Sequence, residues 1–335
     1  MSRQFRGIVV AVGLVAVAIV ATSGTVFAST GSTKAKTLQV RIITATPLKS
    51  GTWDPQHYAG YQAAGKAQGW KIQIAETVPY GKATSVLQRW GDQGADIVFA
   101  TDNGFERYVL DAAAKYPKTK WVIMSDMSTT RGLKNVGSYG VDSCQQGVLV
   151  GAVAALITKK NLIGVDTTIP ILPTKKELAG MQVGINLTNP KAKMIIKYTG
   201  DFVDAGKAQE VASALAQQGA DVITVPVNGG TSPETAKRVE QLKLPFVGEN
   251  MDLSPQAPTQ TVTSVVLDFT QGYAEVGKQT SSGTFAAKIR HLGLKEGFFK
   301  VLPFRTHKDL EPKIKAIQDK LRSGKINLTA CENLK

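Results

Sequence analysis

The sequence predicts two similar α/β lobes, each built on a doubly wound parallel sheet, with a ligand cleft between them. Residues 82–98 comprise a helix-like stretch, a Gln-Gly-Ala-Asp turn and an apolar strand, and residues 207–223 repeat this order 125 positions later. Strand-like and helix-like segments alternate. The apolar residues run continuously through the strands, which is typical of parallel sheets covered by helices on both faces. Two such lobes commonly capture a small molecule by closing on it.

In the first lobe, Gly69 ends the first helix and Pro117 follows the third, and both residue types are frequent where helices stop. Apolar runs predict strands at 38–44, 70–75, 96–100, 121–124 and 136–141, and helices at 57–68, 84–93, 107–115 and 147–157. We expect this lobe to span residues 38–155, joined by about 268–305. In that returning segment a helix is predicted at 269–279, and a strand at 298–302 is expected to complete the first sheet.

The second lobe, residues 156–267, repeats the plan. Its predicted strands are 162–165, 192–198, 222–225, 245–248 and 261–266, and its predicted helices are 175–186, 207–218 and 233–241. Residues 306–335 are expected to form a separate C-terminal helix, at 310–322, and a tail. Ligands bind at the carboxyl ends of strands in such sheets, so the loops there are where site residues are sought.

The N-terminus reads as an export signal. Arg3 and Arg6 precede an apolar stretch at 7–20, and Val26-Phe27-Ala28 fits a signal-peptidase site. A retained membrane anchor is the alternative, but the apolar run is short for a span and a polar linker at 29–37 follows. No Cys lies near the cleavage point, so we expect an exported, periplasmic or extracellular protein without a lipid anchor.

Charge and cysteine content limit the partners. The formal charge is +14, but the Lys residues are scattered singly without interleaved aromatics, so we expect a solvated basic surface and no nucleic-acid partner. Cys144 and Cys331 are the two Cys of the chain. In an oxidising compartment they can form a disulfide, and two unpaired buried Cys are the alternative.

Polar and aromatic residues gather in the loops that follow predicted strands. Aromatic faces from opposite lobes can sandwich a flat ring, while Asn and Asp can read its edge by hydrogen bonds. Several of these residues also have structural interpretations: Phe105 as a helix staple, Asp102 as a cap and His57 as a solvent-facing residue. The candidate ligand contacts are Trp53, His57, Asp102, Asn103, Phe105, Phe202, Asn228, Asn250, Asp252 and Asp268.

Signals for catalysis in the sequence are poor. The three His are far apart without metal-ligand spacing, neither Cys lies in a nucleophile motif, and no Gly-rich phosphate loop is found. We therefore expect a binding protein, with no enzymatic activity, no metal and no cofactor.

Taken in order, these motifs resemble the basic membrane protein family of ABC-transporter substrate-binding proteins, of the purine- and nucleoside-binding type. The resemblance covers most of residues 38–328. Its motifs are Gly51-Thr52-Trp53 with His57, Thr101 to Phe105, Tyr139 to Gly151, Asn189-Pro190-Lys191-Ala192, Asp201 to Lys207, Gln218 to Ile223, and Ser323-Gly324-Lys325-Ile326.

The resemblance implies a type I periplasmic-binding-protein fold, a purine-like ligand and delivery to a membrane ABC permease, and we expect a monomer. Trp53 and Phe202 match the stacking positions of the family, with Phe105 adding to them. The residues that match its polar contacts in the second lobe are Asn228, Asn250 and Asp252.

This chain also departs from the family pattern. It lacks the Asp-x-Ser-Phe-Asn of many members, it has Glu249-Asn250-Met251-Asp252 for Val-Asp-x-Asp, and Leu267-Asp268 follows a strand where a Lys is common. A free base or another flat heterocycle is therefore an alternative to a nucleoside. A sugar-binding protein, a ligand-sensing module for a membrane receptor and a nucleoside hydrolase are the rival functions.

Overall fold

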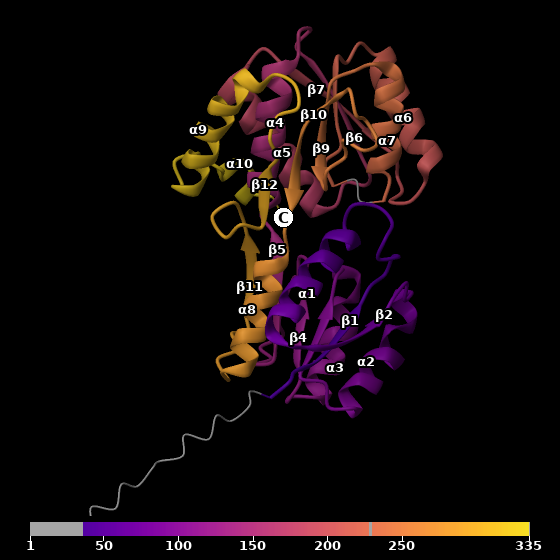
Figure 1. The fold of residues 1–335 in the computed structure, drawn as a ribbon, viewed down its shortest axis with the longest axis vertical. Coiled ribbons are helices and arrows are strands. Elements are labelled where there is room, and N and C mark those ends of the chain that lie inside the picture. Colours follow the sequence, from indigo (N-terminus) through magenta and orange to yellow (C-terminus); the bar gives the residue numbers. More distant parts are fainter. Residues whose placement is uncertain (1–35, 228–229, 335) are drawn as a thin grey trace, which may run out of the picture. The chain divides into compact units, whose positions relative to one another are not determined.

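The computed structural model describes residues 36–227 and 230–334, which contain two six-stranded sheets (Figure 1). The predicted signal peptide, residues 1–28, lies outside the described residues, as does most of the linker after it. No helix in the described part is long and apolar enough to cross a membrane. The two sheets with their helices confirm the predicted fold class of two α/β lobes.

The first lobe has the strand order β11-β5-β4-β3-β1-β2, with all neighbours parallel. The central strand β3 is fully buried and apolar, and β4 is so after its first residue, Lys120, as expected where helices cover both faces. In chain order its elements are β1 (Gln39–Ile43), α1 (Asp54–Gln68), β2 (Lys71–Ala75), η1 (Tyr80–Lys82), α2 (Ala83–Asp92), β3 (Ile97–Ala100), η2 (Asn103–Phe105), α3 (Glu106–Lys115), β4 (Lys120–Ile123), β5 (Val136–Val141), α8 (Thr270–Ser281) and β11 (Ile289–Leu292).

The second lobe has the order β12-β10-β9-β8-β6-β7, which matches the first position by position. Its last strand, β12, differs by pairing antiparallel with β10. The elements are α4 (Ser143–Ile157), β6 (Leu162–Thr167), α5 (Leu172–Thr188), β7 (Lys193–Tyr198), α6 (Ala205–Gln217), β8 (Val222–Thr224), α7 (Ser232–Leu242), β9 (Phe246–Asn250), β10 (Thr261–Leu267), β12 (Phe299–Val301), η3 (Lys308–Leu310), α9 (Glu311–Arg322) and α10 (Thr329–Glu332).

The repeated Gln-Gly-Ala-Asp turn has the same structural role in both lobes. Gly94 and Gly219 have φ of 67° and 92°, a left-handed conformation that glycine adopts without a steric penalty and that ends the preceding helix. The carboxylate of Asp96 accepts a hydrogen bond from the amide of Gln39, and that of Asp221 accepts from the amides of Lys159 and Lys160. Each Asp therefore ties the start of its strand to a neighbouring segment of the same lobe.

In the described residues the chain passes between the lobes at three places, after β5, after β10 and after β11. Two segments join a different lobe from the one expected. Helix α4 packs against α5 and against strands of the second sheet, and so belongs to the second lobe rather than ending the first. Strand β12 pairs with β10 and so extends the second sheet. A strand that the sequence did not suggest, β11, closes the edge of the first sheet instead.

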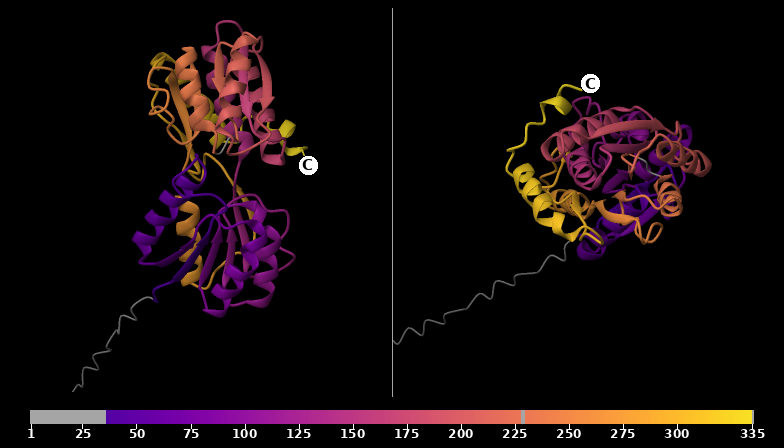
Figure 2. Two further views of the ribbon diagram at one scale, coloured as in Figure 1. Left: turned by 90° about the vertical axis from the view of Figure 1, so that its right-hand side faces the viewer. Right: turned by 90° about the horizontal axis from the view of Figure 1, so that it is seen from above.

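The C-terminal segment, yellow in Figures 1 and 2, is also part of the second lobe and does not stand apart as expected. Helix α9 packs on α4 and helix α10 packs on α5. Cys144, at the start of α4, and Cys331, in α10, form a disulfide with a Cα–Cα distance of 5.9 Å. This bond holds the end of the chain against the helix that begins beside the first crossing.

Helices α4 and α5 approach each other closely because glycines face the partner backbone. A Cβ atom on Gly147 would lie 2.1 Å from the carbonyl oxygen of Glu177, and one on Gly180 would lie 2.1 Å from that of Cys144. Such distances leave no room for a side chain. The close contact brings Glu177, on α5, beside the residues of α4 and β9.

Candidate functional site

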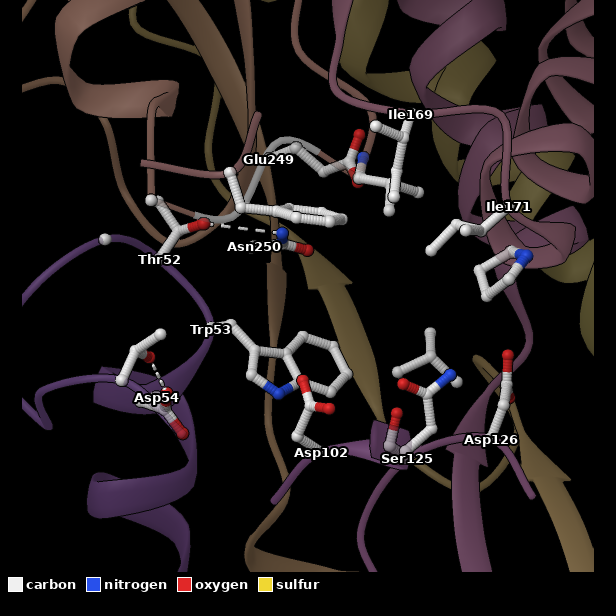
Figure 3. A pocket seen from close by; sticks show the side chains of 18 of the residues that line it. Thr52, Trp53, Asp54, Asp102, Ser125, Asp126, Ile169, Ile171, Glu249 and Asn250 are labelled. Atoms are coloured by element: carbon white, nitrogen blue, oxygen red, sulfur yellow. Dashed lines mark hydrogen bonds between the residues drawn. The ribbon is translucent and has the colours of Figure 1, made fainter. Parts of the chain in front are cut away.

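A cavity of about 350 Å³ lies at the carboxyl ends of the strands of both sheets. Figure 3 shows Trp53, Asp102, Ser125 and Asp126 on one side of it and Ile169, Ile171, Glu249 and Asn250 on the other. This is where doubly wound sheets bind ligands. The first lobe contributes Thr46, Pro47, Ser50, Gly51, Thr52, Trp53, Asp54, Tyr80, Asp102, Asn103, Ser125, Asp126 and Val141, and the second contributes Ser143, Gln146, Ile169, Ile171, Pro173, Glu177, Phe202, Val203, Val227, Gly230, Glu249 and Asn250.

The indole of Trp53 forms part of the first-lobe wall and is held from behind. Its Nε1–H donates to the carbonyl oxygen of Thr101 at 2.9 Å. Its ring makes edge contacts with His57 and Phe269, at centroid distances of 4.8 and 5.2 Å. Trp53 is therefore partly buried in its lobe, with the rest of the ring turned to the cavity.

His57, predicted from the sequence as a ligand contact, belongs to this supporting layer and does not line the cavity. The ring is fully buried, stacks on Phe269 at 3.8 Å, and its Nδ1 lies 2.9 Å from the hydroxyl of Tyr273. Burial lowers the pKa of His57 well below its usual value, so the imidazole is neutral at physiological pH. Helix α8 returns to the first lobe and supplies the residues that complete this layer.

Carboxylates follow the first-lobe strands. Asp54, at the start of α1, accepts hydrogen bonds from the hydroxyls of Thr46 and Thr101. Burial nevertheless raises its pKa to about 6. Asp102 accepts from the hydroxyl of Tyr80 at 2.7 Å and from the amide of Gly104 at 2.6 Å.

Asp126, after β4, is the third carboxylate on this side. Its Oδ1 lies 3.1 Å from Nε2 of His291 on β11. It follows a buried strand directly, so the rule that selected Asp102 also applies to this position, although the sequence analysis did not single it out.

The second-lobe wall contains two buried carboxyl groups, Glu177 and Glu249, which lie close enough to affect each other's ionisation. Burial raises the pKa of both groups, that of Glu249 to about 7, and the proximity of Glu249 raises the pKa of Glu177 further. We therefore assign a proton to Glu177, which donates it toward Glu249. This assignment satisfies one oxygen on each group, Oε1 of Glu177 and Oε2 of Glu249, that has no other hydrogen-bond partner.

Gln146 connects this pair to Asn250. Its buried side-chain amide donates to Oε1 of Glu249 at 3.0 Å and to Oδ1 of Asn250 at 3.2 Å. The amide of Asn250 in turn points to the hydroxyl of Thr52 in the first lobe, at 3.4 Å (Figure 3). Side chains from α4, β9 and the loop before α1 thus meet at one edge of the cavity.

The backbone around this wall has unusual conformations. Asn250 has φ of 66° and Val227 has φ of 48°, in the left-handed region that β-branched residues rarely adopt. The amide of Val227 points to Oε1 of Glu249 at 3.4 Å. Such conformations persist where the surrounding structure holds them, and they cluster at binding sites.

The predicted site residues divide into two groups. Phe105 is fully buried in the first lobe, with its ring centroid 5.0 Å from that of Tyr80, and it does not line the cavity. Asp252 and Asp268 do not line the cavity, and each accepts a hydrogen bond from a local amide, that of Ser254 and that of Thr270. Asn228 lies outside the described residues. Those that line the cavity are Trp53, Asp102, Asn103, Phe202 and Asn250.

Sequence reasoning missed several lining residues. Glu249 lies in a segment that the sequence analysis treated as a loop. In the structure it belongs to the buried strand β9, where a polar side chain is not expected from the sequence. Glu177 and Gln146 lie on helices, where no local pattern distinguishes them from other polar residues. Among the described residues, no group of three or more His, Cys, Asp or Glu side chains is arranged to hold a metal ion.

Comparisons with known proteins agree with this architecture. A purine-binding protein of Brucella abortus is 24% identical over 294 residues, covering 87% of this chain and 82% of that protein. A putative ABC transporter glucose-binding protein of Haloferax volcanii is 22% identical over 268 residues, covering 80% and 67%. A solved ABC-transporter solute-binding protein from Conexibacter woesei matches with a TM-score of 0.74 at 22% identity, over 87% of this chain and 98% of that one, which shows the type I fold.

The chain also matches a family model over most of its length. Residues 39–329 fit the Bmp family, described as ABC transporter substrate-binding protein PnrA-like. This range includes both sheets and every cavity-lining residue given above. The chain therefore belongs to the Bmp family of PnrA-like ABC-transporter substrate-binding proteins.

Proposed function

We propose that this protein captures a purine nucleoside or a related nucleobase in the cavity and delivers it to a membrane ABC permease. The observation that carries the proposal is that aromatic side chains of both lobes, Trp53 and Phe202, line one cavity together with carboxylate and amide groups. Aromatic rings stack on the faces of a base, and the polar groups hydrogen-bond to its edge or to ribose hydroxyls. The relative from Brucella abortus is named a purine-binding protein, which supports the same ligand class.

We also propose where the protein acts and how it handles its ligand. Residues 1–28 act as a signal peptide that exports the protein to the periplasm or the outside of the cell. The mature protein works as a monomer that binds and releases its ligand without chemical change. Closure of the lobes around the ligand then presents the complex to the permease.

Isothermal titration of the purified protein with adenosine, guanosine, inosine, adenine and guanine tests the ligand class. Trp53→Ala should weaken binding by about 10- to 100-fold, since stacking on one ring contributes roughly 1–3 kcal/mol. Phe202→Ala should weaken it less, because that side chain is 37% exposed. Tyr198→Ala, which removes an exposed ring of the same lobe outside the cavity, is the matched control.

The alternative ligand is a sugar. The relative from Haloferax volcanii bears the name of a glucose-binding protein, and aromatic and carboxylate side chains also suit a pyranose. Glucose and galactose therefore belong in the same titration. Binding of a sugar with no response to any purine would replace the proposed ligand and keep the transport function.

A further inference from the structure

The cavity is acidic although the chain is basic. Among its described lining residues there is no Lys, Arg or His, whereas the formal charge of the whole chain is +14. The lining includes five carboxyl groups, two of which share a proton as assigned above. Two imidazoles contact lining residues without lining the cavity: that of His57, which is buried and neutral, contacts the ring of Trp53, and that of His291 on β11 contacts the carboxylate of Asp126. The carboxyl groups are Asp54, Asp102, Asp126, Glu177 and Glu249.

Helix starts near the cavity also carry their own carboxylates. The start of a helix normally attracts anions, through its free amides and its dipole. Here Asp54 occupies the first turn of α1, Asp102 accepts from the amide of Gly104 at the start of η2, and Asp142 accepts from the amide of Gln145 at the start of α4. The second-lobe helix α5 begins with Leu172 and Pro173, and proline has no amide hydrogen to offer. The helix starts at these positions therefore do little to offset the repulsion between an anionic ligand and the nearby carboxylates.

We propose that the cavity selects its ligand by charge, accepting a neutral or positively charged ring and excluding its phosphorylated counterpart. This inference rests on the proposed function, since it concerns the ligand of the same cavity. A phosphate would enter among carboxylates with no cation to pair with it, while amino and hydroxyl groups of a neutral ligand would find acceptors. The faces of Trp53 and Phe202 add a further attraction for positive charge.

A test that needs no ligand uses collisional quenching of Trp53 fluorescence by caesium and iodide ions at equal ionic strength. Trp53 lines the cavity, whereas Trp70 is 9% exposed and Trp90 and Trp121 are fully buried. The Trp53→Phe protein therefore supplies the background. Relative to free N-acetyltryptophanamide, we expect caesium to quench Trp53 at least about twofold better than iodide. The net positive charge of the chain alone would favour iodide, so equal or better quenching by iodide overturns the proposal.

Variants locate the effect. Asp102→Asn combined with Asp126→Asn should lower the caesium-to-iodide ratio by about twofold, because two charges near the indole are removed with the side-chain shapes kept. Asp111→Asn is the matched control. Asp111 is an exposed carboxylate of the same lobe that pairs with Arg131 and does not line the cavity, so its loss should leave the ratio unchanged. An equal change in both proteins would mean that the field is not that of the cavity, and would overturn the proposal.

Ligand pairs then separate this inference from the proposed function. AMP should bind at least about 100-fold more weakly than adenosine, and glucose 6-phosphate more weakly than glucose if sugars bind. Equal affinity within a pair overturns the charge selection while leaving the function intact. A caesium preference without binding of any purine supports the charge selection and removes only the purine assignment.

Discussion

The two lobes share one strand order, yet they support their sides of the cavity differently. In the first lobe, Trp53 is packed against the buried rings of His57 and Phe269 and is hydrogen-bonded to the backbone of Thr101. In the second lobe, Phe202 is 37% exposed, and the buried groups at that wall are polar: Glu177, Glu249 and Gln146. A ring held from behind loses little freedom when a ligand stacks on it, whereas an exposed ring loses more.

This difference indicates a division of labour between the walls. The first lobe offers a preformed aromatic surface, which costs little conformational entropy to use. The second lobe holds hydrogen-bonding groups in fixed positions through the network of Gln146, Glu249 and Asn250. Its close helix pair and its disulfide restrain the backbone that carries this network. Each lobe can be altered separately to test the comparison.

The largest effect is expected from the disulfide of the second lobe. Replacing Cys144 and Cys331 by Ser should lower the free energy of unfolding by about 2–5 kcal/mol, because the bond closes a loop across 187 positions of sequence. Urea unfolding measures this change. Hydrogen exchange should show it first in α4, α5 and α10, with α1 and α8 little affected. A reductant should destabilise the natural protein and leave the double variant unchanged; uniform loss of protection in both lobes would contradict a local effect.

The carboxyl pair should make the second lobe less stable as the pH rises. Folding raises the pKa of Glu249 from 4.5 to about 7 and that of Glu177 as well, so this contribution to stability is full below pH 4.5 and is lost as the pH rises toward 7. Glu177→Gln keeps a donor to Glu249 without a titrating proton. We expect the variant to lose stability less steeply than the natural protein between pH 4.5 and 7, because one of the two titrating carboxyl groups is gone.

Urea unfolding across this pH range measures the slope in the natural protein and the variant. Glu210→Gln, an exposed residue of α6, is the control and should retain the natural slope. If Glu177→Gln also retains it, the two carboxyl groups do not share a proton.

The first lobe should show the opposite pH dependence, with a smaller magnitude near neutrality. Burial lowers the pKa of His57 below its unfolded value of 6.5, so its contribution to stability is full above pH 6.5 and is lost as the pH falls below it. His57→Phe combined with Tyr273→Phe keeps the ring layer and removes the polar pair together. The variant should therefore be more stable relative to the natural protein at pH 5 than at pH 7.5, as urea unfolding at the two pH values measures.

The same variant tests whether His57 contacts ligand. Because His57 lies behind Trp53 and outside the cavity lining, we expect ligand affinity at pH 7.5 to change by less than about twofold. A loss of affinity that leaves the fold and stability at pH 7.5 intact would show that His57 takes part in ligand binding.

Some features were predictable because their signals are local. The strands and helices follow from apolar runs and turn residues, and Trp53 and Phe202 were selected by polar loop context. Asp252 does not line the cavity; it lies two residues after Asn250, which adopts a left-handed conformation, and it accepts a hydrogen bond from the amide of Ser254. The residues around Asn250 do not by themselves predict this left-handed conformation.

By itself, therefore, the sequence determined two α/β lobes with polar and aromatic loops at their strand ends, since hydrophobic periodicity and turn chemistry act over a few neighbouring residues. Only the tertiary structure decided that α4 and β12 join the second lobe, that Cys144 meets Cys331, and that Glu177 meets Glu249. These outcomes depend on contacts between residues far apart in sequence, such as the glycine-mediated approach of α4 to α5. Their energies come from packing and burial, which no local pattern encodes.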